Sequence, residues 1–271
     1  MTDNELIDGY DAYQAMRNLS DNTRRRRRWS LAGFADQLAY RARDLRSATI
    51  DDVELFLAGK GAPRTRAAVL GDLTCFYRWA SNRGHVPGNP ARAVDYPKIP
   101  QPQARPLSLF ELVLAIRSAK PRLRVMLLLA AYAGLRVSEI AALRIADVDA
   151  ARCVLIVREG KGGKDRIVPL HNDVVDALRV LPIRSDGRVI GTNGQNVSRC
   201  IRDHFELLGI DHRPHDLRAT FATELAQLSN GNMPLVAGLL GHSSTDTTKL
   251  YTAWAPDGRE YVEQLYQRPA A

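Results

Sequence analysis

Six polar side chains in the second half of the sequence have the types that a phosphoryl transfer needs. In chain order they are Arg136, Lys161, His215, Arg218, His242 and Tyr251. A tyrosine hydroxyl can attack a phosphodiester and hold the phosphoryl group covalently, so the strand can be rejoined without ATP. Two arginine forks can stabilise negative charge on the non-bridging oxygens of the phosphate. These residue types favour a metal-free transesterification of a phosphodiester.

The lysine and histidine side chains would move protons or donate hydrogen bonds. Lys161 lies in a glycine-rich loop and can protonate the leaving oxygen as a general acid, with Lys164 of the same loop as the alternative. An unperturbed tyrosine has a pKa of about 10, so the nucleophile needs a base, and His215 is the candidate. His242 would donate to the phosphate. The predicted roles are therefore one nucleophile, one general base, one general acid and several hydrogen-bond donors.

One carboxylate accompanies the six side chains, whereas we expect neither a cofactor nor a metal ion. Glu139 follows Arg136 by one helical turn, and we expect it to orient His215 or an arginine. The pair His212-x-x-His215 has metal-ligand spacing, but no cysteine or carboxylate pair completes a four-ligand site. Gly162 stands where a phosphate-binding P-loop requires Ser or Thr.

Each of these residues has an ordinary structural interpretation when it is taken singly. Arg136 follows an apolar helix and could cap its end, Lys161 could be a solvated turn lysine, and Tyr251 could be a half-buried core residue. Only the ordered set is specific. It comprises Gly134-Leu-Arg136-x-x-Glu139, the Gly-Lys161-Gly turn, His215-x-x-Arg218, and Gly-His242 with Tyr251 nine residues further on.

In this ordered set the sequence resembles the tyrosine recombinase (phage integrase) family. The resemblance extends from the helix that begins at Thr23 to Tyr251, and it favours Lys161 over Lys164 as the family's lysine. One residue departs from the pattern, because Ala219 stands where many relatives have histidine. The resemblance assigns the six catalytic roles to the six side chains named first.

The resemblance implies a site-specific recombinase that cleaves and rejoins DNA through a 3′-phosphotyrosine intermediate. It also implies double-stranded recombination sites as substrate, a tetramer on two duplexes, an accessory directionality factor as a further partner, and a place in the bacterial cytoplasm. Two alternatives stay open. A type IB topoisomerase shares the chemistry but relaxes a single duplex, and a catalytically idle regulator would bind DNA only.

Composition agrees with a DNA-binding protein and excludes several other classes. The 271 residues are 45% hydrophobic and 25% charged, which is ordinary globular composition. Lys and Arg number 38 against 30 Asp and Glu, and 32 of the 38 are Arg, which suits phosphate binding but is also typical of a GC-rich genome. The three cysteines form no Cys-x-x-Cys pair, and the longest uncharged apolar run has only 11 residues. A disulfide framework and a membrane span are therefore not expected.

The periodicity of apolar residues predicts two domains of a mainly α fold with a small antiparallel β-hairpin. Residues 1–96 contain four helical patterns and are expected to form a core-type DNA-binding domain. Four prolines within residues 97–106 predict a stiff linker. Residues 107–271 would form the catalytic domain, with helices on both sides of a hairpin at residues 154–157 and 166–169. The two domains would form a DNA clamp.

Two further features concern the DNA contacts and the C-terminal tail. The predicted phosphate contacts of the first domain are Arg24, Arg25, Arg27, Arg28, Arg64 and Arg66, and members of the run at residues 24–28 that miss the groove would be solvated. Lys164 is a further contact in the second domain. A tail helix at residues 257–267 carries one apolar stripe, which docks either on a neighbouring protomer or on its own domain.

Overall fold

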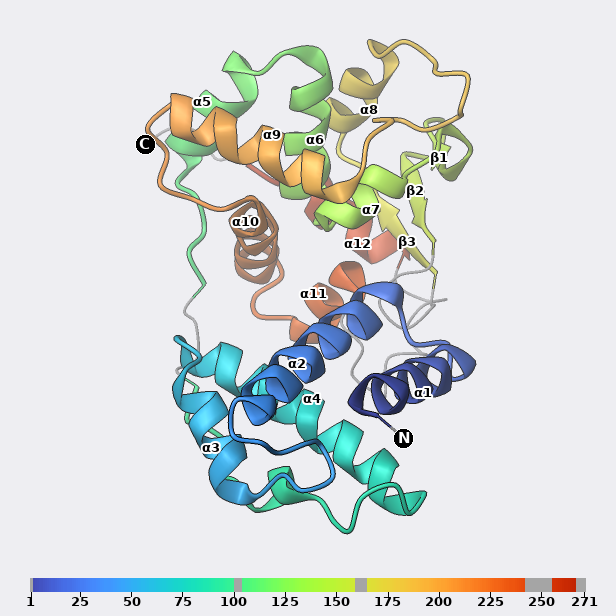
Figure 1. The fold of residues 1–271 in the computed structure, drawn as a ribbon. Helices are drawn as coiled ribbons and strands as arrows, with labels where there is room; N and C mark the ends of the chain where they lie inside the picture. Colours follow the sequence, from blue (N-terminus) through green and yellow to red (C-terminus); the bar gives the residue numbers. More distant parts are fainter. Residues whose placement is uncertain (1, 100–103, 159–164, 242–254, 267–271) are drawn as a thin grey trace. The chain divides into compact units, whose positions relative to one another are not determined.

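The computed structural model describes residues 2–99, 104–158, 165–241 and 255–266, and in the last stretch it describes side chains from residue 258 onward. The chain forms two compact units, Met1–Pro102 and Gln103–Ala271. Within the described residues, no helix is both long enough and apolar enough to cross a membrane. The observed fold class is the predicted one, mainly α with a small antiparallel sheet (Figure 1).

The first unit is a bundle of α-helices whose starts follow from local capping. Its elements are α1 (Asp3–Met16), α2 (Asp21–Ala39), α3 (Ile50–Ala58), α4 (Pro63–Asn82) and a short 3-10 turn at Pro90–Ala93. Thr2 and Thr49 form capping boxes that satisfy the free N–H groups of α1 and α3, Ser20 caps α2, and Pro63 occupies the first position of α4. The buried faces meet in one core rich in aromatic side chains.

The arginine run of α2 is held largely by carboxylates of its own unit. Arg24 binds Asp11 of α1 through two hydrogen bonds, and Arg27 donates to Tyr10 and Gln14 of the same helix. Asp72 of α4 is buried and pairs with both Arg26 and Arg27, while Arg28 pairs with Asp8. Arg25, Arg26 and Arg28 are exposed, as expected for solvated members of the run, whereas Arg24 and Arg27 are half-buried and bind groups of their own unit. A buried carboxylate needs partners, and the run supplies them.

The remaining predicted phosphate contacts of this unit differ in how far their side chains are exposed to solvent. Arg25 is exposed and has no hydrogen-bond or ion-pair partner among the described residues. Arg64 is exposed in the first turn of α4, whereas Arg66 is half-buried and donates to the carbonyl of Gly61. Arg24 and Arg27 are committed to Asp11, Gln14 and Asp72 within the unit.

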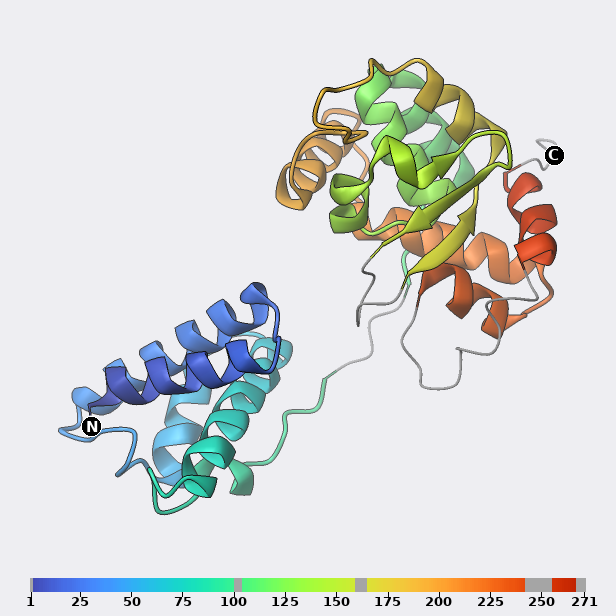
Figure 2. The ribbon, with the colours of Figure 1, turned by 90° about the vertical axis from the view of Figure 1, so that its right-hand side faces the viewer.

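The second unit packs its helices behind and beside a three-stranded antiparallel sheet, which faces the viewer in Figure 2. The elements before the sheet are α5 (Leu109–Ser118), α6 (Pro121–Tyr132), α7 (Val137–Ala142) and a 3-10 turn at Ile145–Asp147. The sheet consists of β1 (Val148–Asp149), β2 (Val154–Val157) and β3 (Arg166–Pro169). The helices after the sheet are α8 (Asn172–Arg179), α9 (Gly194–Leu207), α10 (Pro214–Leu228), α11 (Met233–Leu240) and α12 (Ala255–Glu263). The strands β2 and β3 confirm the predicted hairpin, with Val157 opposite Arg166. A capping box of Ser108 and Glu111 begins α5.

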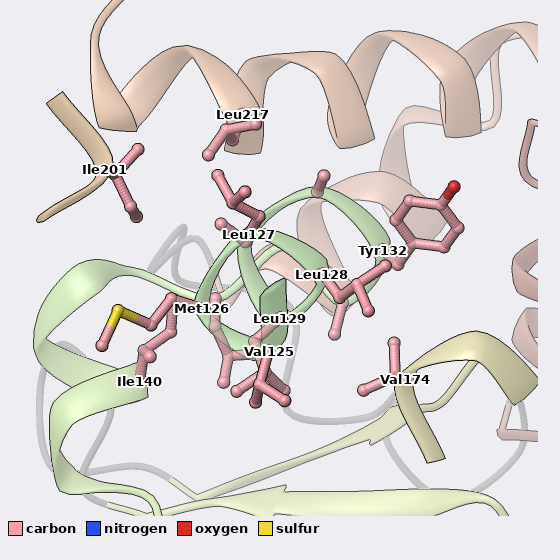
Figure 3. Close-up of a cluster of buried hydrophobic side chains, with 14 of the residues drawn as sticks. Val125, Met126, Leu127, Leu128, Leu129, Tyr132, Ile140, Val174, Ile201 and Leu217 are labelled. Carbon is pink, nitrogen blue, oxygen red and sulfur yellow. The ribbon is translucent and has the colours of Figure 1, made fainter. Parts of the chain in front are cut away.

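The core of the second unit is built around α6. Every residue from Val125 to Tyr132 is buried, because neighbouring helices pack around this part of α6 and leave it without a polar face. Figure 3 shows its side chains surrounded by residues from four other helices, Ile140 of α7, Val174 of α8, Ile201 of α9 and Leu217 of α10. The C-terminal end of this rigid helix is where the candidate site begins.

The C-terminal helix α12 lies against its own unit. Val262 and Leu265 are fully buried in a cluster with side chains of α10 and α11, and the Tyr266 hydroxyl donates to the carbonyl of Ala131 at 2.8 Å. The predicted apolar stripe is thus present and, within this one chain, packs against its own unit. The helix begins at Ala255 and ends at Glu263, earlier than the predicted 257–267.

Candidate active site

A left-handed turn at Gly134 leads from the buried helix α6 into the candidate site. Gly134 has a φ of +63°, and a Cβ atom there would lie 2.6 Å from Cδ1 of Phe221. Only glycine satisfies both conditions, since other residues disfavour this backbone region and a methyl group would collide. The turn directs the carbonyl of Gly134 toward α10 and places Arg136 at the start of α7.

Arg136 and Glu139 form a local pair at the start of α7. Glu139 accepts hydrogen bonds from the backbone N–H of Arg136 through Oε2 and from Nη1 of its guanidinium through Oε1, both at 2.8 Å. The Arg136 side chain keeps 26% of its surface exposed, whereas that of Glu139 keeps 8%. Glu139 therefore orients an arginine. No contact with His215, the other predicted role for this carboxylate, occurs within the described residues.

Arg166 is a member of the site that sequence reasoning missed. It is the first residue of β3, its side chain is 3% exposed, and it binds Glu139 in bidentate fashion with Nη1–Oε1 at 2.9 Å and Nη2–Oε2 at 2.8 Å. A signal was present in the sequence. Residues of a strand alternate between faces, so Arg166 shares the buried face with Val168 while Ile167 is exposed.

The two arginines hold Glu139 ionised inside the protein. Burial works to raise the pKa of the Glu139 carboxyl, but the hydrogen bonds and positive charge of Arg166, together with the hydrogen bonds from Arg136, outweigh it and lower the pKa to about 2. Glu139 is therefore a carboxylate at every physiological pH, which suits it to hold arginines and not to exchange protons.

Arg218 lies deeper than Arg136 and is held by backbone carbonyl groups. Its guanidinium donates to the carbonyls of Gly134 and Leu240, and its Nη1 lies 3.9 Å from Glu139. Burial, followed by repulsion from Arg136, lowers the pKa of Arg218 to about 9, and the attraction of Glu139 opposes that shift. A lowered pKa means that the cation is under-compensated in its pocket, so it gains from an added anion.

Three consecutive carbonyls at the C-terminal end of α11 each accept from a different arginine. Leu239 accepts from Nε of Arg166 at 3.0 Å, Leu240 accepts from Arg218, and Gly241 accepts from Nη2 of Arg136 at 3.5 Å. The last carbonyls of a helix have no intrahelical partner and carry partial negative charge, which the arginines satisfy. Gly241 adopts φ +63°, which ends the helix beside the arginines.

Counting charges shows that the site has a surplus of positive charge. Three guanidinium groups, those of Arg136, Arg166 and Arg218, surround the single carboxylate of Glu139, which is their only ion-pair partner among the described residues. The local formal charge is therefore +2. Such a pocket is arranged to receive an anion with two negative charges or a phosphodiester in a more highly charged transition state.

The structure brings together some of the predicted catalytic residues and does not describe others. Arg136, Glu139 and Arg218 form one site, and His215 is exposed in the first turn of α10, one helical turn before Arg218. Lys161, Lys164, His242 and Tyr251 lie outside the described residues. In the described part of the chain no group of three or more His, Cys, Asp or Glu side chains has the geometry to hold a metal ion.

The sequence around this site matches a known protein family. A profile of the phage integrase family matches residues 108–257, which include all six predicted catalytic side chains. The chain belongs to the phage integrase family. By this membership it is a tyrosine recombinase, in agreement with the resemblance read from the sequence.

Relatives of this phage integrase family member cover its length to different extents. The tyrosine recombinase XerD of Pseudomonas aeruginosa is 32% identical over 292 residues, which cover 97% of this chain and 96% of that protein. The tyrosine recombinase XerA of Thermococcus kodakarensis is 35% identical over 171 residues, and this alignment spans 58% of the chain and 60% of that protein.

Solved structures support the fold of this phage integrase family member. A lambda integrase dimer bound to a core site has a TM-score of 0.73 at 21% identity, with 90% of this chain and 96% of that chain covered. A lambda integrase tetramer bound to a Holliday junction gives a TM-score of 0.71 at 20% identity, with coverage of 94% and 79%.

Proposed function

We propose that this chain is a site-specific DNA recombinase that cleaves and rejoins duplex DNA through a 3′-phosphotyrosine formed on Tyr251. The observation that carries the proposal is the surplus of positive charge around Arg136 and Arg218. Guanidinium forks held 2.8 Å and 3.9 Å from one shared carboxylate leave donors free for the non-bridging oxygens of a phosphodiester.

In this proposal the arginines supply the charge stabilisation that metal ions supply in many other phosphoryl transfer sites. Tyr251 attacks the phosphorus, its proton passes to His215, and Lys161 protonates the departing 5′ oxygen, so that one P–O bond forms as another breaks. His242 donates to a non-bridging oxygen. The covalent intermediate retains the bond energy, and the free 5′ hydroxyl of a second strand reverses the step.

The DNA partner is proposed to be a double-stranded recombination site, with the first unit as its second binding element. Arg25, Arg28 and Arg64 are exposed and are the proposed phosphate contacts of that unit. Lys164 is the proposed contact of the loop between β2 and β3. Lambda integrase, which shares the fold, was solved as a tetramer on a Holliday junction. A tetramer on two duplexes and an accessory directionality factor are proposed for this chain by analogy.

Covalent trapping tests the proposed function. The wild-type protein is incubated with sheared duplex DNA of its host, denatured in SDS, and the DNA that stays attached to protein is sequenced. We expect a protease-sensitive adduct joined at one recurring sequence and formed equally well in EDTA. The Tyr251→Phe variant should bind the recovered duplex with unchanged affinity and form no adduct.

Each alternative result has a defined meaning. Adducts at unrelated sequences together with relaxation of supercoiled plasmid would favour a topoisomerase. Specific binding with no adduct from the wild-type protein would favour a regulator that binds DNA without cleaving it. A normal adduct yield from Tyr251→Phe would exclude this tyrosine as the nucleophile.

A further inference from the structure

Arg166 uses three separate N–H groups to join three parts of the second unit. Its two terminal nitrogens bind the two oxygens of Glu139 in α7, and its Nε donates to the carbonyl of Leu239 in α11, while its backbone belongs to β3. A lysine has one nitrogen on a flexible stem and cannot reproduce this planar three-way contact. The arrangement therefore requires arginine specifically.

Arg166 shares Glu139 with Arg136 atom by atom. Oε1 accepts from Nη1 of Arg136 and Nη1 of Arg166, and Oε2 accepts from the backbone N–H of Arg136 and Nη2 of Arg166. The bidentate contact fixes the plane of the carboxylate. Because Arg136 donates to the same two oxygens, the plane set by Arg166 also sets the direction of the more exposed guanidinium.

Stability alone does not account for this buried charge. The attraction within a buried ion pair offsets little more than the free energy lost when the two charges leave water. Apolar side chains of similar volume often stabilise a fold as well or better. Arg166 is 3% exposed, so it is also too deep to meet a DNA strand directly. What the ion pair adds is a fixed geometry, and the elements that it fixes carry the site.

The position of Arg166 in the chain connects these elements to the remaining candidate residues. Arg166 follows Lys164 by two residues and Lys161 by five, at the start of β3. Its acceptor Leu239 lies two residues before Gly241, after which His242 begins the segment that leads to Tyr251. One guanidinium thus anchors the exit of the lysine loop, the carboxylate that holds Arg136, and the end of α11.

We propose that Arg166 is a positioning residue for the phosphoryl transfer, acting through Glu139 on Arg136 and through Leu239 on the end of α11. The inference rests on the proposed function, because it assigns Arg166 a role in that same reaction. It requires that loss of Arg166 slow the chemical step while DNA binding stays intact.

The test separates the chemical step from DNA binding in the full-length protein. The probe is the duplex recovered by trapping with the wild-type protein. For Arg166→Gln, we expect the rate of adduct formation at saturating DNA to fall by about 10- to 100-fold, by analogy with the loss seen when partners that orient the ligands of a metal site are mutated. The dissociation constant for the duplex should change by less than about twofold, and Arg166→Lys should be intermediate because it keeps the charge without the fork.

A double-mutant cycle tests the route through Glu139. If Arg166 acts partly through this carboxylate, adding Arg166→Gln to the Glu139→Gln variant should slow the reaction by a smaller factor than Arg166→Gln does in the wild type, because only the contact with Leu239 is then lost. Multiplication of the two losses would overturn the route. The matched control is Arg179→Gln, which changes an exposed arginine of α8 paired with the exposed Asp176 and should leave the rate unchanged.

The remaining outcomes are also decisive. If Arg166→Gln does not fold by circular dichroism, Arg166→Lys takes its place in every comparison. Unchanged rates in the folded variants, or a loss of duplex affinity without a loss of rate, would overturn the inference while the wild-type adduct still supports the proposed function. Absence of an adduct from the wild-type protein would instead reject the proposed function.

Discussion

Two groups of arginines in this molecule differ in how far nearby carboxylates balance their charge. In the first unit, the run on α2 meets carboxylates from α1 and α4, with Arg24 on Asp11, Arg28 on Asp8, and Arg26 and Arg27 on Asp72. In the second unit, three arginines far apart in the sequence lie around one carboxylate and donate their other hydrogen bonds to backbone carbonyls. Arg24 also pairs with Asp21, so the four paired arginines of the first group face four carboxylates, whereas the three arginines of the second group face one and keep a net charge of +2.

The difference teaches that the number of arginines in a stretch does not measure its capacity to bind an anion. Capacity depends on how many positive charges remain after the folded chain has paired its own groups. Arginines paired with carboxylates mainly tie helices together. Arginines paired with carbonyl oxygens keep their full formal charge, because a carbonyl satisfies a donor without cancelling its charge.

The largest expected effect comes from removing the exposed arginine of the second group. Arg136→Gln should slow adduct formation at saturating DNA by about 10²- to 10³-fold, the usual cost of removing one donor to a developing anion. Rapid-quench measurement with the recovered duplex checks the rate, and Arg24→Gln is the matched control because its guanidinium is already paired with Asp11. An equal loss of rate in the two variants would contradict the distinction between the two arginine groups.

The second prediction concerns pH and the single carboxylate of the site. The pKa of Glu139 is about 2 in the folded chain against 4.5 for the free side chain, so the folded state favours the ionised form. Its contribution to the free energy of unfolding, on the order of 3 kcal/mol, is complete above about pH 4.5 and is lost as the pH falls toward about 2. The stability gap between wild type and Glu139→Gln, measured by urea denaturation, should close over that range. A gap that widens on acidification would contradict the assignment.

The third prediction concerns the paired group. Arg27→Gln should lower the stability of the first unit by about 1 to 3 kcal/mol, because it removes hydrogen bonds to Gln14 and Tyr10 and one partner of buried Asp72. The rate of adduct formation at saturating DNA should not change. Urea denaturation of the full chain checks the stability. Arg25→Gln serves as control and should shift it by less than about 0.5 kcal/mol.

The smallest effect should be seen in the salt dependence of DNA binding. If Arg25 contacts a phosphate, Arg25→Gln should reduce the slope of log affinity against log salt by about 0.9. Arg24→Gln should reduce it by less, since Asp11 already neutralises that guanidinium. Filter binding or fluorescence anisotropy over a range of salt concentrations gives both slopes. The same reduction in both variants would show that pairing within the unit does not govern phosphate contacts.

Local signals predicted most of the fold. The hairpin strands were predicted residue for residue, because β-branched runs on both sides of a glycine-rich loop have few other solutions. Local start signals also stand at the first residues of two helices, the capping-box spacing of Ser108 and Glu111 before α5 and the proline at position 63 in α4. The short elements α7 and β1 were missed, since six and two residues are too few to show a period.

The site was predictable only where its residues form recognisable motifs. Arg136, Glu139 and Arg218 lie in such motifs, and the structure brings them together. Arg166 lies in none, and its role depends on contacts with α7 and α11 that no local pattern encodes. The pairing of the α2 run depends likewise on acidic residues of α1 and α4, which only the packed bundle brings within reach.

The carbonyl oxygens that hold the three arginines also determine how the site responds to random mutation. The peptide backbone supplies them at residues 134, 239, 240 and 241, and no change of codon removes a backbone oxygen. Besides the three arginines themselves, the positions most sensitive to missense mutation are Glu139 and two glycines. A Cβ atom at Gly134 would collide with Phe221, and one at Gly241 would lie 3.0 Å from Arg166. If selection on the protein is relaxed, a missense mutation at one of these three codons should disrupt the arginine cluster more often than a missense mutation elsewhere in α11.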